Sequence, residues 1–245
     1  MRQYLLKIDL IDQRDFIYKV AAPTALQLPE EVDLRPLDTD IMDQGSLGSC
    51  TANAILGLKQ FLDKRRDNYY FYLSRLYLYW HERALHGWEN EDSGAFIRDG
   101  MKILATQGCA RESFYPYSRT DYKHPPSAEA EADAGNYKIT EYRRVLTFEA
   151  IQQSLAEGFP VVAGMDVYSA FESSAVGRTG VVPMPKNGEQ YLGSHAVLVV
   201  GYKKINGSLY AIMRNSWGVN WGDKGYFYLP KDYFTAYVQD MWTAR

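Results

Sequence analysis

Cysteine is scarce in this sequence, and no group of residues has the spacing of a metal site. The 245 residues include only Cys50 and Cys109, so at most one disulfide could form. There is no Cys-x-x-Cys pair, and the four histidines show no ligand spacing with cysteine or carboxylate. Structural metal sites need such pairs of ligands. We therefore expect no disulfide framework, no bound metal and no cofactor.

Long apolar runs and blocks of like charge are also missing. No apolar run approaches the roughly 18 residues that span a bilayer, and residues 1–20 carry acidic groups where an export signal would be basic and then apolar. The 27 basic and 30 acidic residues are mixed along the chain, without a basic stripe. Neither nucleic acid nor a membrane is therefore an expected partner. With so little cysteine and no signal, we expect a reducing, cytoplasmic location.

What is present is enough apolar sequence for a large core. Hydrophobic residues make up 46% of the chain, and its length fits one large domain or two small ones. Ile55, Leu58 and Leu62 recur at helical spacing, which predicts a buried helix that begins at or just before Cys50. Further helices are expected after the N-caps Ser74 and Ser93, and the helix that follows Ser93 is expected to stop at Gly108. The first half therefore reads as mainly helical.

The second half has the period of a sheet. The polar, proline-containing stretch 123–135 is typical of a loop or crossover, and a short helix capped by Thr147 follows it. The turn Asn206–Gly207 predicts a β-hairpin. The expected strands are 161–167, 196–200 and 209–213.

Residues 1–29 differ from the rest of the chain. Tyr4, Leu6, Ile8 and Leu10 alternate with less apolar neighbours, which is a strand period, and residues 22–29 read as an extended connector. We expect an N-terminal arm over residues 1–29, which could serve as a short pro-segment, and a main domain over residues 30–245. Within that domain the mainly helical half covers about 30–130 and the mainly sheet half about 131–245.

Cys50 ends a loop of small residues, Gln44 to Ser49, that leads directly into the first predicted helix. Its glycines let the backbone turn back, so that the Gln44 side chain could approach the sulfur. The N-terminus of a helix favours an anion, which would lower the pKa of the thiol and produce an attacking thiolate. The alternative is that Cys50 only fills space, as most unpaired cysteines do. The loop alone leaves both open.

A cysteine nucleophile needs a base, and His195 is the best placed histidine. It lies among small residues at the start of a predicted buried strand. A lone histidine is usually structural, so the assignment of His195 as a base holds only if Cys50 is the nucleophile. Asn215 follows the strand expected over residues 209–213, which pairs with the strand that follows His195. There its carbonyl could accept the imidazole N–H while Trp217 covers that bond. The alternative is that Asn215 is purely structural. A strict two-residue hairpin would not set His195 opposite Asn215, so we expect a bulge near Gly201.

The order Gln44, Cys50, His195, Asn215 resembles the papain (C1) family of cysteine peptidases. The resemblance runs from about Leu28 to Leu229 and rests on three separated motifs. Cys50 precedes His195 by the roughly 130–150 residues typical of papain-like sequences. The supporting segments are Val32–Arg35, Asn215-Ser216-Trp217-Gly218, Trp221-Gly222 and Gly225-Tyr226.

The resemblance implies an α+β fold with a helical half, an antiparallel barrel-like half and an active-site cleft between them. It assigns Cys50 as nucleophile, His195 as base and then acid, Asn215 as the residue that orients the base, and Gln44 with the Cys50 N–H as the oxyanion hole. Substrate-binding positions implied by the family are Ser93, Gly94, Gly164, Ala196 and Trp217. Departures from the family pattern are Leu47 for a disulfide cysteine, Thr51 for an aromatic, and Ser194 before the histidine.

The expected function is therefore that of a cysteine-type endopeptidase acting on a polypeptide through an acyl-enzyme. Two alternatives keep the same fold: a peptide ligase or acyl transferase, because an amine can intercept the acyl-enzyme, and a catalytically retired binding module. The arm adds a further expectation. An extended strand of this length could lie across the cleft, so residues 1–29 are predicted to inhibit the enzyme partially.

Overall fold

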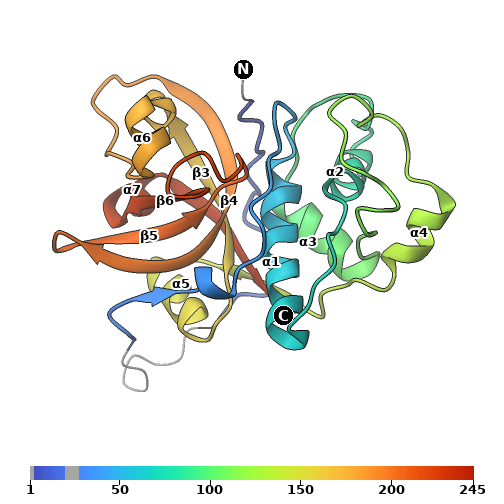
Figure 1. The fold of residues 1–245 in the computed structure, drawn as a ribbon, viewed down its shortest axis with the longest axis horizontal. Coiled ribbons are helices and arrows are strands. Elements are labelled where there is room, and N and C mark those ends of the chain that lie inside the picture. The colour runs from blue at the N-terminus through green and yellow to red at the C-terminus, as the bar shows by residue number, and fades with distance from the viewer. Residues whose placement is uncertain (1–2, 20–27) are drawn as a thin grey trace.

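The computed structural model describes residues 3–19 and 28–245, so most of the connector expected over residues 22–29 lies outside the described residues. Figure 1 shows the sheet on one side of helix α1 and the other long helices on the opposite side. The elements are β1 (Val32–Asp33), η1 (Arg35–Leu37), α1 (Cys50–Asp67), α2 (Arg75–Ala84), α3 (Ile97–Thr106), α4 (Ala128–Ala134), β2 (Tyr142–Val145), α5 (Phe148–Ala156), β3 (Val161–Tyr168), η2 (Ser169–Glu172), α6 (Ser174–Thr179), β4 (Tyr191–Ile205), β5 (Ser208–Arg214), β6 (Tyr226–Pro230), α7 (Lys231–Tyr237) and β7 (Val238–Ala244).

Helix α1 forms the centre of the molecule. It begins at Cys50, as predicted, and ends where Asn68 adopts a left-handed conformation with φ of 54°. Ser74 caps α2 by accepting the Tyr77 N–H at 3.0 Å, which confirms that helix start. Helix α3 starts only at Ile97, later than the expected start after Ser93, so residues 93–96 stay outside the helix.

The loop expected over residues 123–135 contains a helix. The Ser127 hydroxyl accepts the Ala130 N–H at 3.2 Å and caps α4, which runs through alternating alanine and acidic residues. Alanine and glutamate favour helix strongly, and the serine cap supplies the start that such a short element needs. The prediction of irregular structure is therefore wrong for residues 128–134.

The sheet is a seven-stranded antiparallel one with the order β2-β7-β3-β4-β5-β6, and β1 pairs with β4. It stays open, with β2 and β6 at its ends, so the fold is α+β. Asn206 and Gly207, both with positive φ, connect β4 to β5 by a two-residue turn. The register of this hairpin shifts between Val199 and Gly201, which confirms a bulge near the predicted position. The bulge brings the end of β5 toward His195.

Residues 3–19 of the N-terminal arm cross the middle of the molecule between the sheet and α1 (Figure 1). Leu5 forms a parallel bridge with Ser194 in β4, and Lys7 forms another with Phe96 just before α3. Farther along, the Tyr18 N–H donates to the Arg144 carbonyl at 2.8 Å and extends the sheet beyond β2. The described part of the arm is therefore bonded to both halves of the fold.

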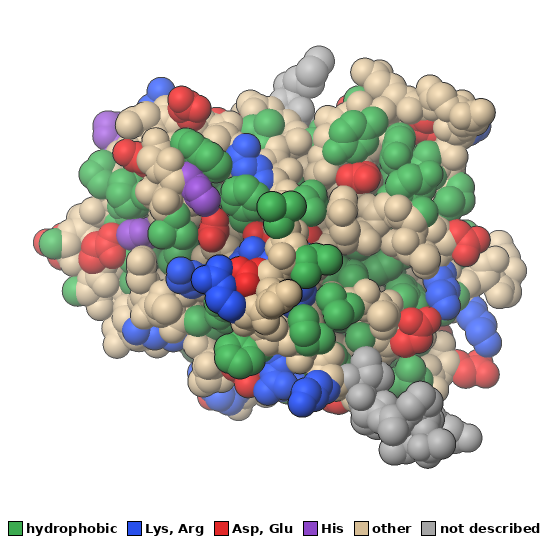
Figure 2. All heavy atoms as spheres, turned by 180° about the vertical axis from the view of Figure 1, so that it is seen from behind, with side chains coloured by type: hydrophobic (Ala, Val, Ile, Leu, Met, Phe, Trp, Pro, Cys, Tyr) green, Lys and Arg blue, Asp and Glu red, His purple; other side chains and the backbone are tan. Residues whose placement is uncertain are grey.

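Surface charge is mixed in the view of Figure 2, where acidic and basic side chains alternate over the back of the molecule. Across residues 3–19 and 28–245, no helix is both long enough and apolar enough to pass through a bilayer.

Candidate active site

Cys50 is the first residue of α1. Its side chain is completely buried, and the backbone N–H of Ala196 faces its sulfur. Burial raises the pKa of the thiol to about 12, while the N–H groups of Ala196 and Thr51 lower it only in part. The expected lowering of the Cys50 pKa is therefore wrong for this structure, because loss of water outweighs the helix N-terminus.

His195 and Asn215 form the hydrogen bond that the sequence predicts between them. The His195 Nε2 and Asn215 Oδ1 atoms are 2.9 Å apart in a buried environment. The Ser216 N–H also donates to Asn215 Oδ1 at 2.9 Å, which identifies that atom as the carbonyl oxygen. A carbonyl can only accept, so Nε2 carries the proton. Nδ1 is then the basic nitrogen of the neutral ring.

Trp217 covers this pair. Its ring stacks on the His195 imidazole with centroids 5.3 Å apart and planes 26° apart, and only 5% of the residue is exposed. Trp221 packs edge-on against Trp217 at 4.8 Å. Shielding from water strengthens the His195–Asn215 hydrogen bond, because water no longer competes for its donor and acceptor.

Gln44 is held with its amide group in one orientation. Its Oε1 accepts the Ser216 hydroxyl at 2.5 Å, and its Nε2 donates to the Leu47 carbonyl at 2.9 Å. The Gln44 backbone N–H also donates to the Ser216 carbonyl at 2.9 Å. An amide nitrogen carries two N–H groups, so the side chain keeps a second donor for an oxyanion.

The arm packs against two of the substrate positions that the family resemblance implies. At Gly94, which has φ of +69°, a Cβ would lie 1.8 Å from the Leu5 carbonyl oxygen, so a larger residue could not stand there. At Gly164, a Cβ would lie 2.7 Å from Leu6 Cδ2. Ser93 donates its hydroxyl to the Gly94 carbonyl at 3.0 Å. Gly94 and Gly164 therefore lie directly against the backbone and side chains of the arm.

Two further contacts of the arm were missed by the sequence analysis. The Lys7 N–H donates to the Ala95 carbonyl at 3.0 Å, so backbone pairing occurs one residue beyond Ser93–Gly94. At Gly193, with φ of +127°, a Cβ would lie 2.5 Å from the Tyr4 carbonyl oxygen. A glycine two residues before a candidate base was a usable signal for close approach of another backbone. Alanine at position 95 gave no such signal.

No cation site accompanies these residues. Over the described ranges 3–19 and 28–245, no group of three or more histidine, cysteine, aspartate or glutamate side chains is arranged to hold a metal ion. What the arrangement can supply is a sulfur nucleophile, an oriented imidazole and N–H donors, which are the groups that acyl transfer requires.

Known proteins share this sequence pattern and this fold. Residues 28–242 match the family model described as "Papain family cysteine protease". The crystal structure of xylellain, a cysteine protease from Xylella fastidiosa, is 37% identical, has a TM-score of 0.90, and aligns with 100% of this chain and 97% of its own.

Curated relatives agree. An uncharacterized peptidase C1-like protein of Acanthamoeba polyphaga mimivirus is 39% identical over 216 residues, which are 83% of this chain and 69% of that protein. Cathepsin S of Bos taurus is 29% identical over 84% of this chain, and the chain spans only 61% of its length. With the family model matching most of the residues, the chain belongs to the papain family of cysteine proteases.

Proposed function

We propose that this chain is a cysteine-type endopeptidase in which Cys50 is the nucleophile, His195 the base and Asn215 the residue that orients the base. The observation that carries the proposal is the 2.9 Å bond from His195 Nε2 to Asn215 Oδ1. This bond leaves Nδ1 as the basic nitrogen of His195. The next residue, Ala196, directs its backbone N–H at the Cys50 sulfur.

Catalysis follows from these groups in two steps. His195 Nδ1 accepts the proton of Cys50, the thiolate attacks the substrate carbonyl carbon, and the Cys50 and Gln44 N–H groups stabilise the oxyanion. The imidazolium then gives its proton to the leaving amine, which leaves a thioester on Cys50. Water attacks the thioester while His195 removes its proton. The carboxylate product departs, and the thiol is restored by the same proton.

Product analysis tests hydrolysis against acyl transfer. We expect mass spectrometry of a digested peptide to show fragments with free carboxylates, because water is the acceptor in the proposed mechanism. Added amine nucleophile at millimolar concentration should change only a minor part of the product. Fragments that carry the amine as the main product, with little free acid, would favour the ligase or acyl transferase alternative.

We further propose that the arm inhibits the enzyme from within the chain. Tyr4 packs edge-on against the His195 ring at 6.0 Å, and Leu6, only 7% exposed, fills the space beside Gly164. Leu6 donates its N–H to the Ser194 carbonyl at 3.1 Å, on the sheet side of the cleft. A polypeptide substrate needs the same backbone and pocket, so it cannot bind until these contacts open.

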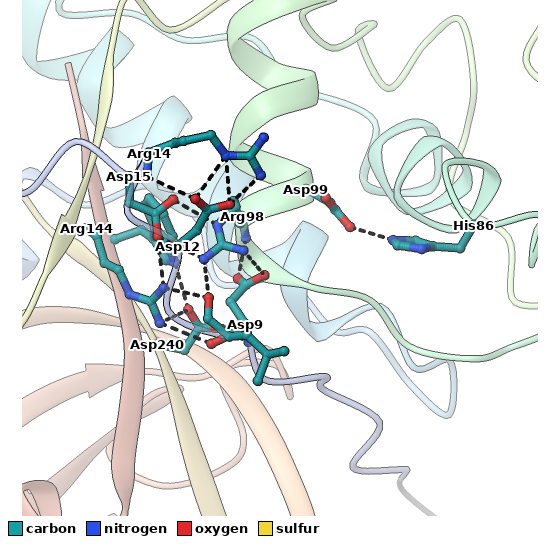
Figure 3. Close-up of polar contacts among 11 residues, drawn as sticks. Asp9, Asp12, Arg14, Asp15, His86, Arg98, Asp99, Arg144 and Asp240 are labelled. Carbon is teal, nitrogen blue, oxygen red and sulfur yellow. Dashed lines mark hydrogen bonds and ion pairs between the residues drawn. The ribbon is translucent and has the colours of Figure 1, made fainter.

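A cluster of five charged side chains holds the next part of the arm (Figure 3). Arg98 forms a two-pronged ion pair with Asp15 at 3.0 and 2.8 Å, and Arg144 contacts the same carboxylate at 3.0 Å. Asp9 accepts the Arg98 backbone N–H at 2.8 Å and donates its own N–H to Asp240 at 3.0 Å. The cluster joins the arm to α3, β2 and β7, so it stabilises the closed cleft.

The cluster predicts a pH dependence of inhibition. Burial and the neighbouring Asp240 carboxylate raise the pKa of Asp9 well above its ordinary value, so closure of the arm takes up a proton. Closure should then weaken as pH rises above about 4, the ordinary pKa of aspartate. Asp9→Asn removes this titration. We expect the ratio of Cys50 alkylation rates, wild type over Asp9→Asn, to increase with pH.

Taking this ratio cancels the titration of Cys50 and His195, which both proteins share. Asp12→Asn is the matched control, because Asp12 lies on the same arm and, among the described residues, only Arg14 donates hydrogen bonds to its carboxylate. Its ratio to wild type should stay flat. A flat ratio for Asp9→Asn as well would refute the role of Asp9 in closure.

A further inference from the structure

Arg214 is a buried arginine that directly precedes Asn215. It is the last residue of β5, stands opposite Leu198 of β4, and is only 5% exposed. A buried guanidinium is costly unless all of its donors find partners. Its partners therefore show what this residue does.

The guanidinium binds three consecutive residues of another segment. Nη1 donates to the Asp38 carboxylate at 2.5 Å and to the Thr39 hydroxyl at 2.9 Å, while Nη2 donates to the Asp40 carbonyl at 2.5 Å. Tyr226 completes the group by donating its hydroxyl to the other carboxylate oxygen of Asp38 at 2.8 Å. Only a planar, forked side chain can satisfy these acceptors together, so lysine would not replace this arginine.

The segment so held leads into Gln44. Four residues after Asp40, Gln44 is bonded to Ser216 through both its backbone and its side chain. Arg214 and Ser216 flank Asn215 in the sequence, and both are tied to residues 38–44. The strand end that carries Asn215 and the segment that carries Gln44 are therefore joined on both sides of Asn215.

The same guanidinium also faces the nucleophile's helix. Gly57 of α1 has no side chain, and a Cβ there would lie 3.6 Å from the Arg214 guanidinium carbon. Lys64, also in α1, donates to the Asp38 carbonyl. Arg214 thus lies where α1, the end of β5 and the segment before Gln44 meet, and these elements supply Cys50, Asn215 and Gln44.

We propose that Arg214, paired with Asp38, is a positioning residue that fixes Asn215 and Gln44 relative to Cys50. The inference rests on the proposed function. It says that the pair serves mainly to hold the catalytic groups in place, and only secondarily to stabilise the fold. A buried ion pair seldom stabilises a fold more than a neutral pair of similar size does. A displacement of about 1 Å in a catalytic group, by contrast, can slow a reaction about 100-fold.

The test is a double variant, Arg214→Met with Asp38→Asn, assayed as the full chain with a peptide substrate. It leaves no lone buried charge, and the asparagine still accepts from Tyr226. We expect kcat to fall about 10- to 100-fold. KM should stay within about twofold, because no group that binds substrate is changed. The midpoint of thermal unfolding should not fall. Arg214→Lys keeps a buried charge and should also lower kcat.

The matched control is Lys59→Met with Asp63→Asn. This pair is also buried, with side chains 5% and 10% exposed, and both of its members belong to α1. It should leave kcat unchanged.

A wild-type kcat in both Arg214 proteins would overturn the inference while leaving the proposed function intact. If the wild-type chain itself has no peptidase activity with the arm displaced, the proposed function fails and the inference with it. Should the double variant not fold, Arg214→Lys decides.

Discussion

Replacing Cys50 by alanine is expected to lower kcat/KM for an unfolded polypeptide by about 10,000-fold or more, because no other group can form the acyl-enzyme. His195→Ala should cost a similar factor, since the thiol then has no base. Catalytic groups that act as a unit are not additive, so the double variant should be no slower than either single variant. Peptide cleavage followed by mass spectrometry measures all three.

Each variant has a matched control in the same chain. Cys109 is equally buried but donates its thiol to the Ser74 carbonyl at 3.3 Å, in the helical half. His124 lies exposed in a loop. Cys109→Ala and His124→Ala should retain the wild-type rate. Cleavage that survives in Cys50→Ala, or that is lost equally in Cys109→Ala, would contradict the assignment of the nucleophile.

Leu6→Glu is expected to activate the enzyme. Leu6 is 7% exposed and fills the space beside Gly164, so the substitution removes about 2 kcal/mol of apolar burial and would place a carboxylate in an apolar pocket. When the closed state dominates, activity follows the open fraction, and 2 kcal/mol then corresponds to about a 30-fold increase. Turnover of a small fluorogenic peptide measures this directly.

The matched control is Leu10→Glu, four residues along the same arm, where the leucine is 84% exposed. It adds the same charge without touching the cleft and should leave turnover unchanged. A folded Leu6→Glu protein with unchanged or lower turnover would show that the arm supports the fold and does not inhibit.

Local patterns in the sequence were sufficient for much of the fold. The apolar spacing after Thr51 located α1, Ser74 located the start of α2, and the Asn206–Gly207 turn located the central hairpin. Each of these signals acts over a few residues. The bulge near Gly201 was also predictable, because two motifs fixed on paired strands had to meet.

Long-range contacts could not be predicted in the same way. The Arg214–Asp38 pair joins residues 176 apart in the sequence, and nothing near either residue indicates the other. The same reason explains the error over the Cys50 pKa. A helix start is visible in sequence, whereas burial of the thiol to zero exposure depends on how distant elements pack around it.

The most direct measurement of the central claim is the site and rate of alkylation by a mass-tagged epoxide at neutral pH in the Leu6→Glu protein. With the arm displaced, we predict stoichiometric modification of Cys50 and none of Cys109. Adding His195→Ala should slow that reaction strongly, because the imidazole accepts the thiol proton. Modification of Cys109 in place of Cys50, or a rate that does not change without His195, would contradict the pairing of this thiol with this base.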